Sequence, residues 1–382
     1  MAVRWGICSA GKISHDFTVA LKTLPPEDHQ IRHYVQQDFP DYKIQQEEHR
    51  FYTLVRQAPD ARHVVSQFVS LFSSQVVAVV ECQSNDSKQA EEFAQKHGIP
   101  KVYSSYEELA KDPDIDVVYV GIIHPYHHPV GLIFLSAKKN VLCEKPLAMN
   151  LREVKELVAT AKANDVFLME AVWTRFFPVS MEISRLLGRE AVGEVKLVRA
   201  DFGASQKNIP RCVEKELGGG ALLDIGIYCL QFVLMVYDGE KPESVQATGV
   251  CLDTGVDESM VVTLKFSRGR LAVCTCTIAM DLPKEAVVLG TKGTIRVPAH
   301  MWSPTSLIVN GKETQYPVPE PYLPLNFINS TGLRYEAEEV RQCLLKGLKE
   351  SSRMSHSDSA LLAEIMDECR RQVGVVYSQD HQ

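Results

Sequence analysis

Residues 2–14 read Ala-Val-Arg-Trp-Gly-Ile-Cys-Ser-Ala-Gly-Lys-Ile-Ser, and this stretch decides the fold. Its first part is a short apolar run typical of a buried strand, and the residues around Gly11 form a tight turn. An apolar-periodic stretch then runs from Phe17 to Leu24 and predicts a helix. The order strand, turn, helix is the first half of a βαβ unit, in which helices join parallel strands.

The same alternation of apolar strands and amphipathic helices continues to about residue 170. Val76–Val80 and Val117–Gly121 are uncharged, valine-rich runs, as expected of strands that are covered on both faces. Because each parallel connection must cross a face of the sheet, we predict a Rossmann-type, doubly wound α/β domain over residues 1–172. The other elements expected there are helices at 88–97, 129–138 and 151–163 and strands at 141–143 and 166–169.

Residues 173–382 show a different pattern, in which short strands follow one another through tight turns. Turns such as Ser267-Arg268-Gly269 and Thr291-Lys292-Gly293 suit antiparallel hairpins. We therefore predict a second, α+β domain with a mostly antiparallel open sheet, and we expect the Pro-rich segment 302–324 to be irregular. The expected strands are 244–251, 259–266, 270–278, 286–289 and 294–297, and the expected helices are 221–237, 335–349 and 357–373.

Residues 31–75 do not fit this scheme. A connection between a helix and the next strand usually takes a few residues. Here a Gln-rich segment with scattered aromatic residues separates the first helix from Val76. We interpret it as an atypical insertion and a poorly packed excursion, although its periodicity also allows helices at 44–55 and 62–72. Whether it is ordered, or compatible with a cofactor in the same βαβ unit, stays open.

The overall composition narrows the class of protein. The chain has 382 residues, of which 45% are hydrophobic and 23% charged, with a net charge of -7, so a soluble, two-domain protein without a nucleic-acid or anionic-lipid partner is expected. Ten scattered cysteines without a Cys-x-x-Cys pair predict free thiols and a cytoplasmic location. No apolar run approaches the roughly 20 residues that a membrane span needs.

The first turn is placed to bind a dinucleotide. Backbone amides at the start of a helix can receive a pyrophosphate when a strand and a tight turn precede them. Aligned with the fingerprint Gly-x-Gly-x-x-Gly, residues 9–14 keep only the middle glycine, so the motif alone is equally typical of an ordinary βα turn. The residues expected to contact the cofactor here are Ser9, Gly11, Lys12 and Ile13.

The end of the second strand should meet the adenosine ribose. Glu81 would bind the ribose hydroxyls of NAD, whereas Ser84 and Lys88 could accommodate the 2′-phosphate of NADP. These local residues leave the choice between the two nucleotides open.

Two further stretches carry candidate catalytic groups. Glu144-Lys145-Pro146 follows a parallel strand, at the edge where open α/β sheets bind ligands. Asp224 and Tyr228 are four residues apart behind the turn Gly218–Gly220, and hence on one face of a helix. If that face meets the strand end, Lys145 would favour the phenolate of Tyr228 and lower its pKa toward that of a general base. A core tyrosine and a surface lysine are an equally good interpretation from the residues alone.

Other chemistry-bearing residues have simpler interpretations. His124, His127 and His128 lack a carboxylate or cysteine at ligand spacing, so we expect pocket-lining or helix-start residues and no metal. Cys274 and Cys276 share one face of a strand and are expected in the core. A stripe of apolar residues on the helix after Gly220 is expected there too: Leu222, Leu223, Leu230, Phe232 and Val233.

At this point the sequence resembles a known family. Glu144-Lys145-Pro146, the Gly-rich turn with Asp224 and Tyr228, and Gly290–Ile295 are similar to the glucose–fructose oxidoreductase family. Tyr228, where that family usually has histidine, together with Glu170–Pro178 resembles the dimeric dihydrodiol dehydrogenases of mammals within it. The similarity covers nearly the whole chain outside residues 31–75.

This resemblance implies oxidation of trans-1,2-dihydrobenzene-1,2-diol to catechol with NADP rather than NAD, and a second activity on the pentose sugar D-xylose. Lys145 and Tyr228 match the family's catalytic pair, and Asp224 would assist them. The resemblance further implies cofactor contacts by His124, Pro125, Glu144 and Lys145 and a homodimer formed through the second sheet. The residues that it implies for the substrate pocket are Trp173, Arg175, Phe176 and Phe202.

Two departures leave an alternative open. The turn after Val80 lacks the arginine that often receives the 2′-phosphate, and residues 31–75 interrupt the same unit. The alternative is a catalytically silent dinucleotide-binding variant, a sensor or interaction protein, that keeps the fold but is impaired by the insertion.

Overall fold

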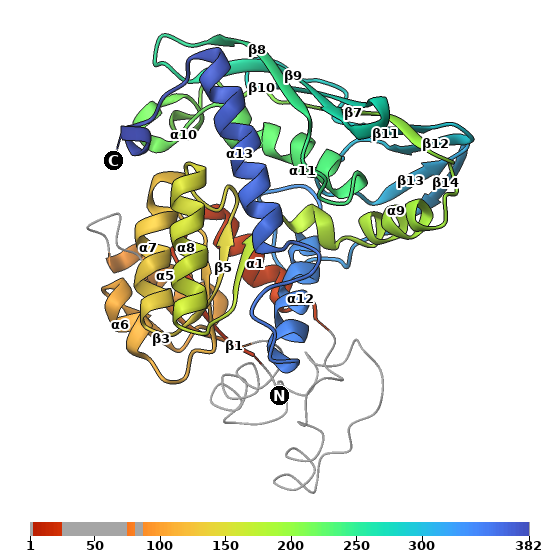
Figure 1. Cartoon of the computed structure of the whole chain (residues 1–382). Helices are drawn as coiled ribbons and strands as arrows, with labels where there is room; N and C mark the ends of the chain where they lie inside the picture. Colours follow the sequence, from red (N-terminus) through yellow and green to blue (C-terminus); the bar gives the residue numbers. More distant parts are fainter. Residues whose placement is uncertain (1–2, 25–74, 81–86, 382) are drawn as a thin grey trace, which may run out of the picture.

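The structure is a computed structural model that describes residues 3–24, 75–80 and 87–381, with the backbone alone for 75–80 and 87–89. Figure 1 shows two sheets, one of them in the red-to-yellow half of the chain and the other in the green-to-blue half. The segment 31–75, apart from Gln75, lies outside the described residues, and so do its two expected helices.

The first sheet has six parallel strands in the order β3-β2-β1-β4-β5-β6. This confirms the doubly wound sheet predicted from the apolar runs. The central strand β4 shows the physical reason, because all four of its side chains are fully buried between the covered faces. The strands are β1 (Arg4–Cys8), β2 (Gln75–Val80), β3 (Lys101–Tyr103), β4 (Val117–Val120), β5 (Asn140–Glu144) and β6 (Leu168–Ala171).

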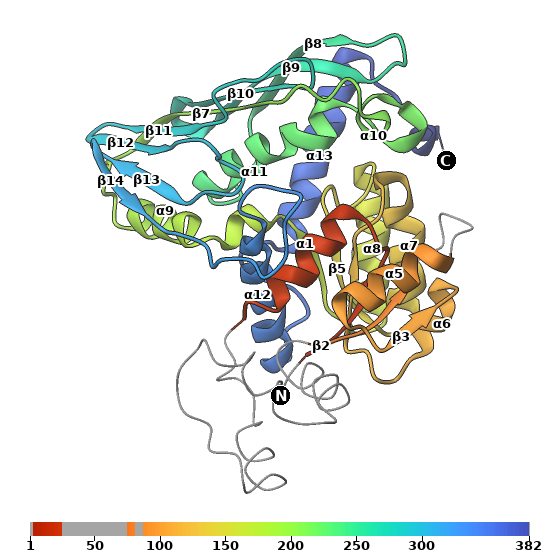
Figure 2. The ribbon, with the colours of Figure 1, turned by 180° about the vertical axis from the view of Figure 1, so that it is seen from behind.

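Helices cover both faces of this sheet. Figures 1 and 2 show α7 and α8 on one face and α1 on the other. The start of α8 is fixed by Asn150, whose side chain accepts a hydrogen bond from the Glu153 amide at 3.0 Å. Short elements that the sequence analysis missed are β3 and α6. The helices are α1 (Lys12–Leu21), α5 (Ser87–His97), α6 (Tyr106–Lys111), α7 (His127–Ser136) and α8 (Leu151–Ala163).

The second sheet has eight strands in the order β14-β13-β12-β11-β7-β10-β9-β8. All its pairs are antiparallel except β7 with β10, which confirms a mostly antiparallel sheet. The strands are β7 (Val195–Gly203), β8 (Ser244–Cys251), β9 (Asp257–Phe266), β10 (Arg270–Thr277), β11 (Ala286–Gly290), β12 (Gly293–Val297), β13 (Ser306–Val309) and β14 (Lys312–Gln315).

The expectation of an irregular segment at 302–324 was wrong in part. Strands β13 and β14 lie within it and form a hairpin joined by Asn310 and Gly311. Both turn residues have positive φ, 50° and 83°, which is the backbone conformation of a two-residue type I′ turn. The dipeptide Asn-Gly is a strong hairpin signal, and the neighbouring prolines obscured it.

Helices of the second half pack on the second sheet, and some of them also contact the first half of the chain. Helix α11 packs against β7 and β10, while α13 packs against both β8 and α8 and so bridges the sheets (Figure 1). Helix α12 packs on α1. The division of domains after residue 172 stays a prediction. These helices are α9 (Pro178–Gly188), α10 (Pro210–Val213), α11 (Ile227–Val236), α12 (Leu333–Leu345) and α13 (His356–Val373).

One helical stretch, Lys215–Val236, has the length and apolar composition of a membrane span. Of its most apolar window, 94% is buried inside the protein, as in a core helix. Its length was not foreseen, because charged residues at 215, 216 and 224 interrupt the sequence run.

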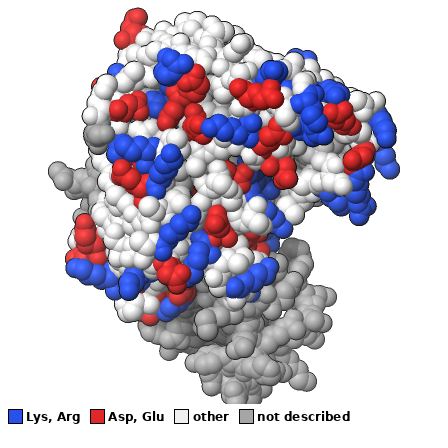
Figure 3. All heavy atoms as spheres, viewed as in Figure 1, with Lys and Arg blue, Asp and Glu red and all other residues white. Residues whose placement is uncertain are grey.

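The expected stripe from Leu222 to Val233 is buried, as are Cys274 and Cys276, and the nine cysteines among the described residues are free thiols. Figure 3 shows basic and acidic side chains next to one another over most of one face.

A chain of two histidines fastens α1 to a later part of the sequence. His15 Nε2 lies 2.9 Å from the carbonyl oxygen of Pro324, which can only accept, so this nitrogen carries the proton. His15 Nδ1 lies 2.8 Å from His97 Nε2, and His97 Nδ1 faces the Tyr322 hydroxyl at 3.4 Å. Burial, followed by the charges of His15 and Lys22, lowers the pKa of His97 from 6.5 to about 3.

We therefore expect stability to fall in mild acid. Between pH 6.5 and pH 3 the unfolded chain protonates His97 while the folded protein does not, so acid favours unfolding. The contribution of His97 should drop by about 1–2 kcal/mol between pH 7 and pH 5. Urea unfolding of the wild type and His97→Gln at both pH values measures it. An equal stability difference between the two proteins at both values would contradict the lowered pKa of His97.

Candidate functional site

The carboxyl ends of three strands meet at one edge of the first sheet. Cys8, the last residue of β1, pairs with Val120 of β4, and Val120 pairs with Cys143 of β5. The strand order reverses its direction between β1 and β4, which is where open α/β sheets bind their ligands. The turns that follow these strands, at residues 9–12, 121–124 and 144–146, therefore lie together.

The first of these turns suits a pyrophosphate. Ser9 has a φ of 95°, the left-handed conformation that favours glycine, and its hydroxyl accepts the Gly11 amide at 3.2 Å. Helix α1 then begins at Lys12 without a side-chain cap or an acidic residue in its first turn. Amides at a helix start, together with the exposed Lys12, are a donor set for an anion. The expected dinucleotide contacts thus fit the residues present.

The residues expected at the adenosine ribose cannot be placed. Glu81 and Ser84 lie outside the described residues, and Lys88 is described only as backbone in α5.

Lys145 and Asp224 join the two halves of the molecule. Lys145 Nζ donates to the carbonyl oxygen of Asp224 at 2.7 Å and lies 3.4 Å from its Oδ1. A second cation that the sequence analysis missed, Arg211, binds the same carboxylate at 2.8 and 3.3 Å. Burial alone would raise the pKa of Asp224, but Lys145 and Arg211 hold it well below its ordinary value. Asp224 is thus a charged, buried anchor for both cations.

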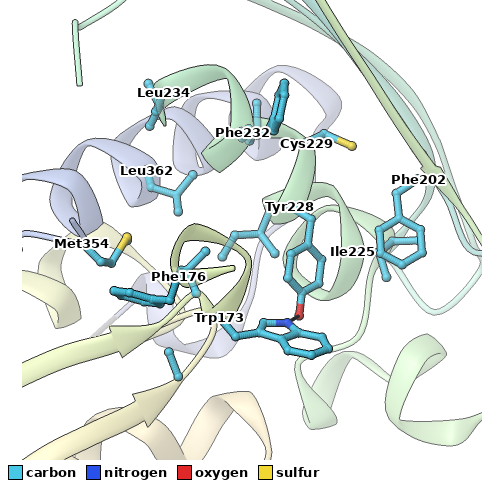
Figure 4. Close-up of a cluster of buried hydrophobic side chains, with 14 of the residues drawn as sticks. Trp173, Phe176, Phe202, Ile225, Tyr228, Cys229, Phe232, Leu234, Met354 and Leu362 are labelled. Atoms are coloured by element: carbon cyan, nitrogen blue, oxygen red, sulfur yellow. Dashed lines mark hydrogen bonds between the residues drawn. The ribbon is translucent and has the colours of Figure 1, made fainter. Parts of the chain in front are cut away.

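Tyr228 lies beside this pair, on α11. Lys145 Nζ is 5.2 Å from the centre of the phenol ring, within range of a cation–π interaction. The phenol oxygen accepts a hydrogen bond from Trp173 Nε1 at 3.0 Å, drawn in Figure 4. Lys145 and Tyr228 therefore lie together as expected, but the ammonium of Lys145 lies over the face of the phenol ring and not at its oxygen.

The expected pKa shift of Tyr228 was wrong in direction. Burial, followed by the nearby Glu144 carboxyl, raises the pKa of Tyr228 well above its ordinary value. Lys145 does not offset this rise because its hydrogen bonds go to Asp224. Without a bound ligand the phenol is protonated, and sequence spacing gave no indication of either effect.

The spacing of Asp224 and Tyr228 also differs from a regular α-helix. Asp224 lies in a π-helical turn, Leu222–Gly226, directly before α11. Such turns insert an extra residue and are frequent at functional sites. Gly226 is needed there, because a Cβ would lie 2.7 Å from the Cys276 sulfur of β10. Both Asp224 and Tyr228 nevertheless reach Lys145, as expected.

Two of the four expected pocket residues surround Tyr228. Trp173 binds the phenol, and the ring of Phe202 has its centre 5.8 Å from that of Tyr228. Trp302, which the sequence analysis placed in an irregular segment, stacks on Phe202 at 4.1 Å. Figure 4 shows Tyr228 with Trp173 and Phe202 close to it.

Arg175 and Phe176 lie elsewhere. Arg175 points toward the C-terminal helices, where Nη1 donates to the carbonyl oxygen of Arg353 at 2.9 Å and pairs with Asp358 at 3.3 Å. Phe176 is buried in the core, on the side of Met354 in Figure 4. Nothing in the sequence pattern distinguishes these two residues from Trp173.

The loop after β4 contacts the Gly-rich turn. His124 Nδ1 lies 2.9 Å from the carbonyl oxygen of Gly218, and burial followed by Lys145 lowers the pKa of His124, so Nδ1–H donates. Pro125 packs on the same glycine, where a Cβ would lie 2.9 Å from its ring. At the neighbouring strand end, Glu144 accepts the Tyr119 hydroxyl at 2.5 Å.

The three histidines of this loop do not converge. His127 lies between the carbonyl oxygens of Pro146 and Ile122, and His128 binds Glu156 at 2.8 Å. Within the described ranges, no three His, Cys, Asp or Glu residues are grouped to hold a metal ion.

Family comparisons match both halves of the chain. A profile described as an oxidoreductase family with an NAD-binding Rossmann fold, GFO/IDH/MocA, matches residues 44–172. A profile of the GFO/IDH/MocA C-terminal domain matches residues 180–296.

Several curated relatives have the same name, trans-1,2-dihydrobenzene-1,2-diol dehydrogenase. The protein from Danio rerio is 66% identical over 382 residues and covers 100% of both sequences. Its counterpart from Xenopus tropicalis is 53% identical, with 99% of this chain and 100% of the relative covered. The human protein is 42% identical, with 100% and 99% covered.

Solved structures share the fold over nearly the full length. Levoglucosan dehydrogenase in complex with NADH and levoglucosan has a TM-score of 0.73 at 18% identity, with 98% of each chain covered. KijD10, a 3-ketoreductase from Actinomadura kijaniata in complex with NADP, has a TM-score of 0.70 at 20% identity, again with 98% of each covered.

Lys145, Asp224 and Arg211 form an ion cluster, and removing different members should lower the free energy of unfolding by different amounts. Asp224→Asn leaves the largely buried Lys145 ammonium without its charge partner and should lower the free energy of unfolding by about 3 kcal/mol. Arg211→Ala should lower it by less than about 1 kcal/mol, because the side chain of Arg211 is 39% exposed and can be solvated. Equal losses in chemical denaturation would contradict the role given to the Lys145–Asp224 pair.

Proposed function

The chain belongs to the GFO/IDH/MocA oxidoreductase family, and on this premise we propose that it is an NADP-dependent dehydrogenase. Its substrates are trans-1,2-dihydrobenzene-1,2-diol, which it oxidises to catechol, and D-xylose, which it oxidises to D-xylonolactone. The observation that carries the proposal is the meeting of Lys145 with Tyr228 beside the carboxyl edge of the first sheet. The names of the relatives at 42–66% identity support the diol.

Tyr228 acts as the general base. After its own proton has been released to solvent, the phenolate oxygen takes the proton of the substrate hydroxyl, while the hydrogen on the same carbon leaves as hydride. NADP, when bound, supplies the hydride acceptor and a positive ring that favours the phenolate. Trp173 favours the same anion by donating a hydrogen bond to its oxygen, and Lys145 lies over the face of the phenol ring. The ketone formed from the diol tautomerises to an aromatic ring, which draws the oxidation forward.

The chain's own residues also orient the reactants. Asp224 and Arg211 hold Lys145 in place through the buried carboxylate. The Ser9–Lys12 turn and the start of α1 would bind the pyrophosphate, with His124, Pro125 and Glu144 beside it. The rings of Trp173, Phe202 and Trp302 offer flat walls that suit an apolar diol.

The preference for NADP rests on the resemblance to the dihydrodiol dehydrogenases. Fluorescence titration with NADPH and NADH tests it, and NADPH should bind at least about tenfold more tightly, or 1.4 kcal/mol. Equal affinities would contradict the preference. Saturable binding without turnover of either substrate would instead favour the silent alternative, which deletion of residues 31–75 would test further.

We also propose a cytoplasmic homodimer formed through the outer face of the second sheet. Large apolar side chains are exposed on three adjacent strands of this face: Val250 on β8, Val261 on β9 and Leu271 on β10. Light scattering of the purified protein measures the mass, and a monomer would contradict the proposal.

The catalytic role of Tyr228 is tested by removing one oxygen. Tyr228→Phe should lower kcat by roughly 10²–10⁴ while changing the dissociation constant of NADPH by less than about threefold, because only the proton acceptor is lost. Tyr237→Phe is the matched control, since its hydroxyl donates to the Leu271 carbonyl oxygen at 2.8 Å, beyond the end of α11. Oxidation by Tyr228→Phe at the parent rate would show that the role is wrong.

A further inference from the structure

A segment of the second half of the chain lies along α1, and we call residues 322–330 the strap. It belongs to the connection between β14 and α12, which Figure 2 shows in blue beside α1. Its first part is held by the histidine chain, through Pro324 and Tyr322. Most hydrogen bonds of its remaining part to α1 are accepted by one carboxylate, Asp16.

Asp16 is fully buried in the middle of α1 and accepts hydrogen bonds from three strap residues. Oδ1 accepts from the amide of Asn326 at 2.9 Å and from its side chain at 2.8 Å. Oδ2 accepts from the amide of Phe327 at 2.9 Å and from the hydroxyl of Ser330 at 2.5 Å. Hydrogen bonds to a buried, charged acceptor are among the strongest in proteins. Asp16 is therefore the side chain of α1 that binds the second part of the strap, from Asn326 to Ser330.

The same contact reaches the start of α1. Asn326 Nδ2 also lies 3.3 Å from the carbonyl oxygen of Lys12, in the turn whose amides face the expected pyrophosphate site. The strap thus fixes the position of this turn relative to the second half of the chain.

A series of packed side chains connects the strap with Tyr228, the candidate base. Ser330 begins the 3-10 turn Ser330–Gly332, and a Cβ on Gly332 would overlap the ring of Phe177. The rings of Phe177 and Trp173 meet edge to face at 5.4 Å, and Trp173 binds the phenol of Tyr228. Rigid contacts of this kind can transmit a small displacement from one site to another.

We propose that Asp16 is a positioning residue of the oxidoreductase reaction: by binding Asn326, Phe327 and Ser330 it sets the start of α1 relative to Tyr228. This inference rests on the proposed function, and it adds a residue that touches neither reactant. Its loss should therefore impair the transfer step more than it impairs cofactor binding.

Asp16→Asn is the direct test, because it keeps the size of the side chain but replaces one acceptor oxygen with a donor. Hydrogen exchange at the amides of Asn326 and Phe327 should become at least about tenfold faster, since one loses its partner. The dissociation constant of NADPH should change by less than about threefold, and kcat should fall at least about tenfold. Ser330→Ala, a milder variant, should change exchange and kcat in the same direction.

Asp112→Asn is the matched control. Asp112 is also a buried carboxylate of the first half, but it accepts the Tyr103 hydroxyl at 2.7 Å and the Asp114 amide at 2.8 Å, before the amino end of β4. Its replacement should lower stability while leaving exchange in the strap and kcat at wild-type values.

Faster exchange of the strap amides in Asp16→Asn and Ser330→Ala with an unchanged kcat would overturn the proposal. Unchanged exchange in Asp16→Asn would overturn it as well. An equal loss of kcat in Asp112→Asn would also overturn it, because general destabilisation would then explain the effect. If the wild type binds NADPH but oxidises neither substrate, the proposed function fails. Protection of the strap amides by NADPH in the wild type, and its loss in Asp16→Asn, then decides whether Asp16 couples the two parts.

Discussion

The site depends on one buried ion pair between the two halves of the chain. Lys145 comes from the end of β5 and Asp224 from the π-helical turn before α11, and together they bring the two halves within hydrogen-bond distance. A buried pair of this kind costs desolvation, so geometry and further hydrogen bonds must offset that cost. Arg211 and the Asp224 carbonyl oxygen supply them. The main effect of the pair is therefore to fix where Lys145 and Asp224 lie relative to each other, and its net contribution to stability is smaller.

That position has a chemical consequence for Tyr228. Its phenol is buried and protonated, with the ammonium of Lys145 over the ring and the indole of Trp173 at the oxygen. In the free protein the Tyr228 phenol is neutral. A positively charged nicotinamide ring beside it would favour the phenolate, so Tyr228 would ionise mainly when the oxidised cofactor is bound. Proton removal and hydride transfer would then depend on the same binding event.

The sequence predicted the parts of this arrangement that follow from local patterns. Uncharged runs such as Val117–Val120 indicated a covered parallel sheet, and the strand end before Lys145 indicated the ligand edge. Long-range contacts could not be predicted in this way. No local pattern around Arg211 or Trp302 indicates that they contact Asp224 and Phe202. The direction of the Tyr228 pKa shift depends on burial and on Glu144, and both are properties of the folded chain.

A crystal structure of the protein with bound NADP tests the central claim most directly. The account predicts that the pyrophosphate contacts the amides at the start of α1 and that the nicotinamide ring lies next to Tyr228 and Lys145, with the Lys145–Asp224 pair intact. A dinucleotide bound away from the carboxyl edge of the first sheet, or a ring separated from the Tyr228 hydroxyl by other side chains, would contradict it.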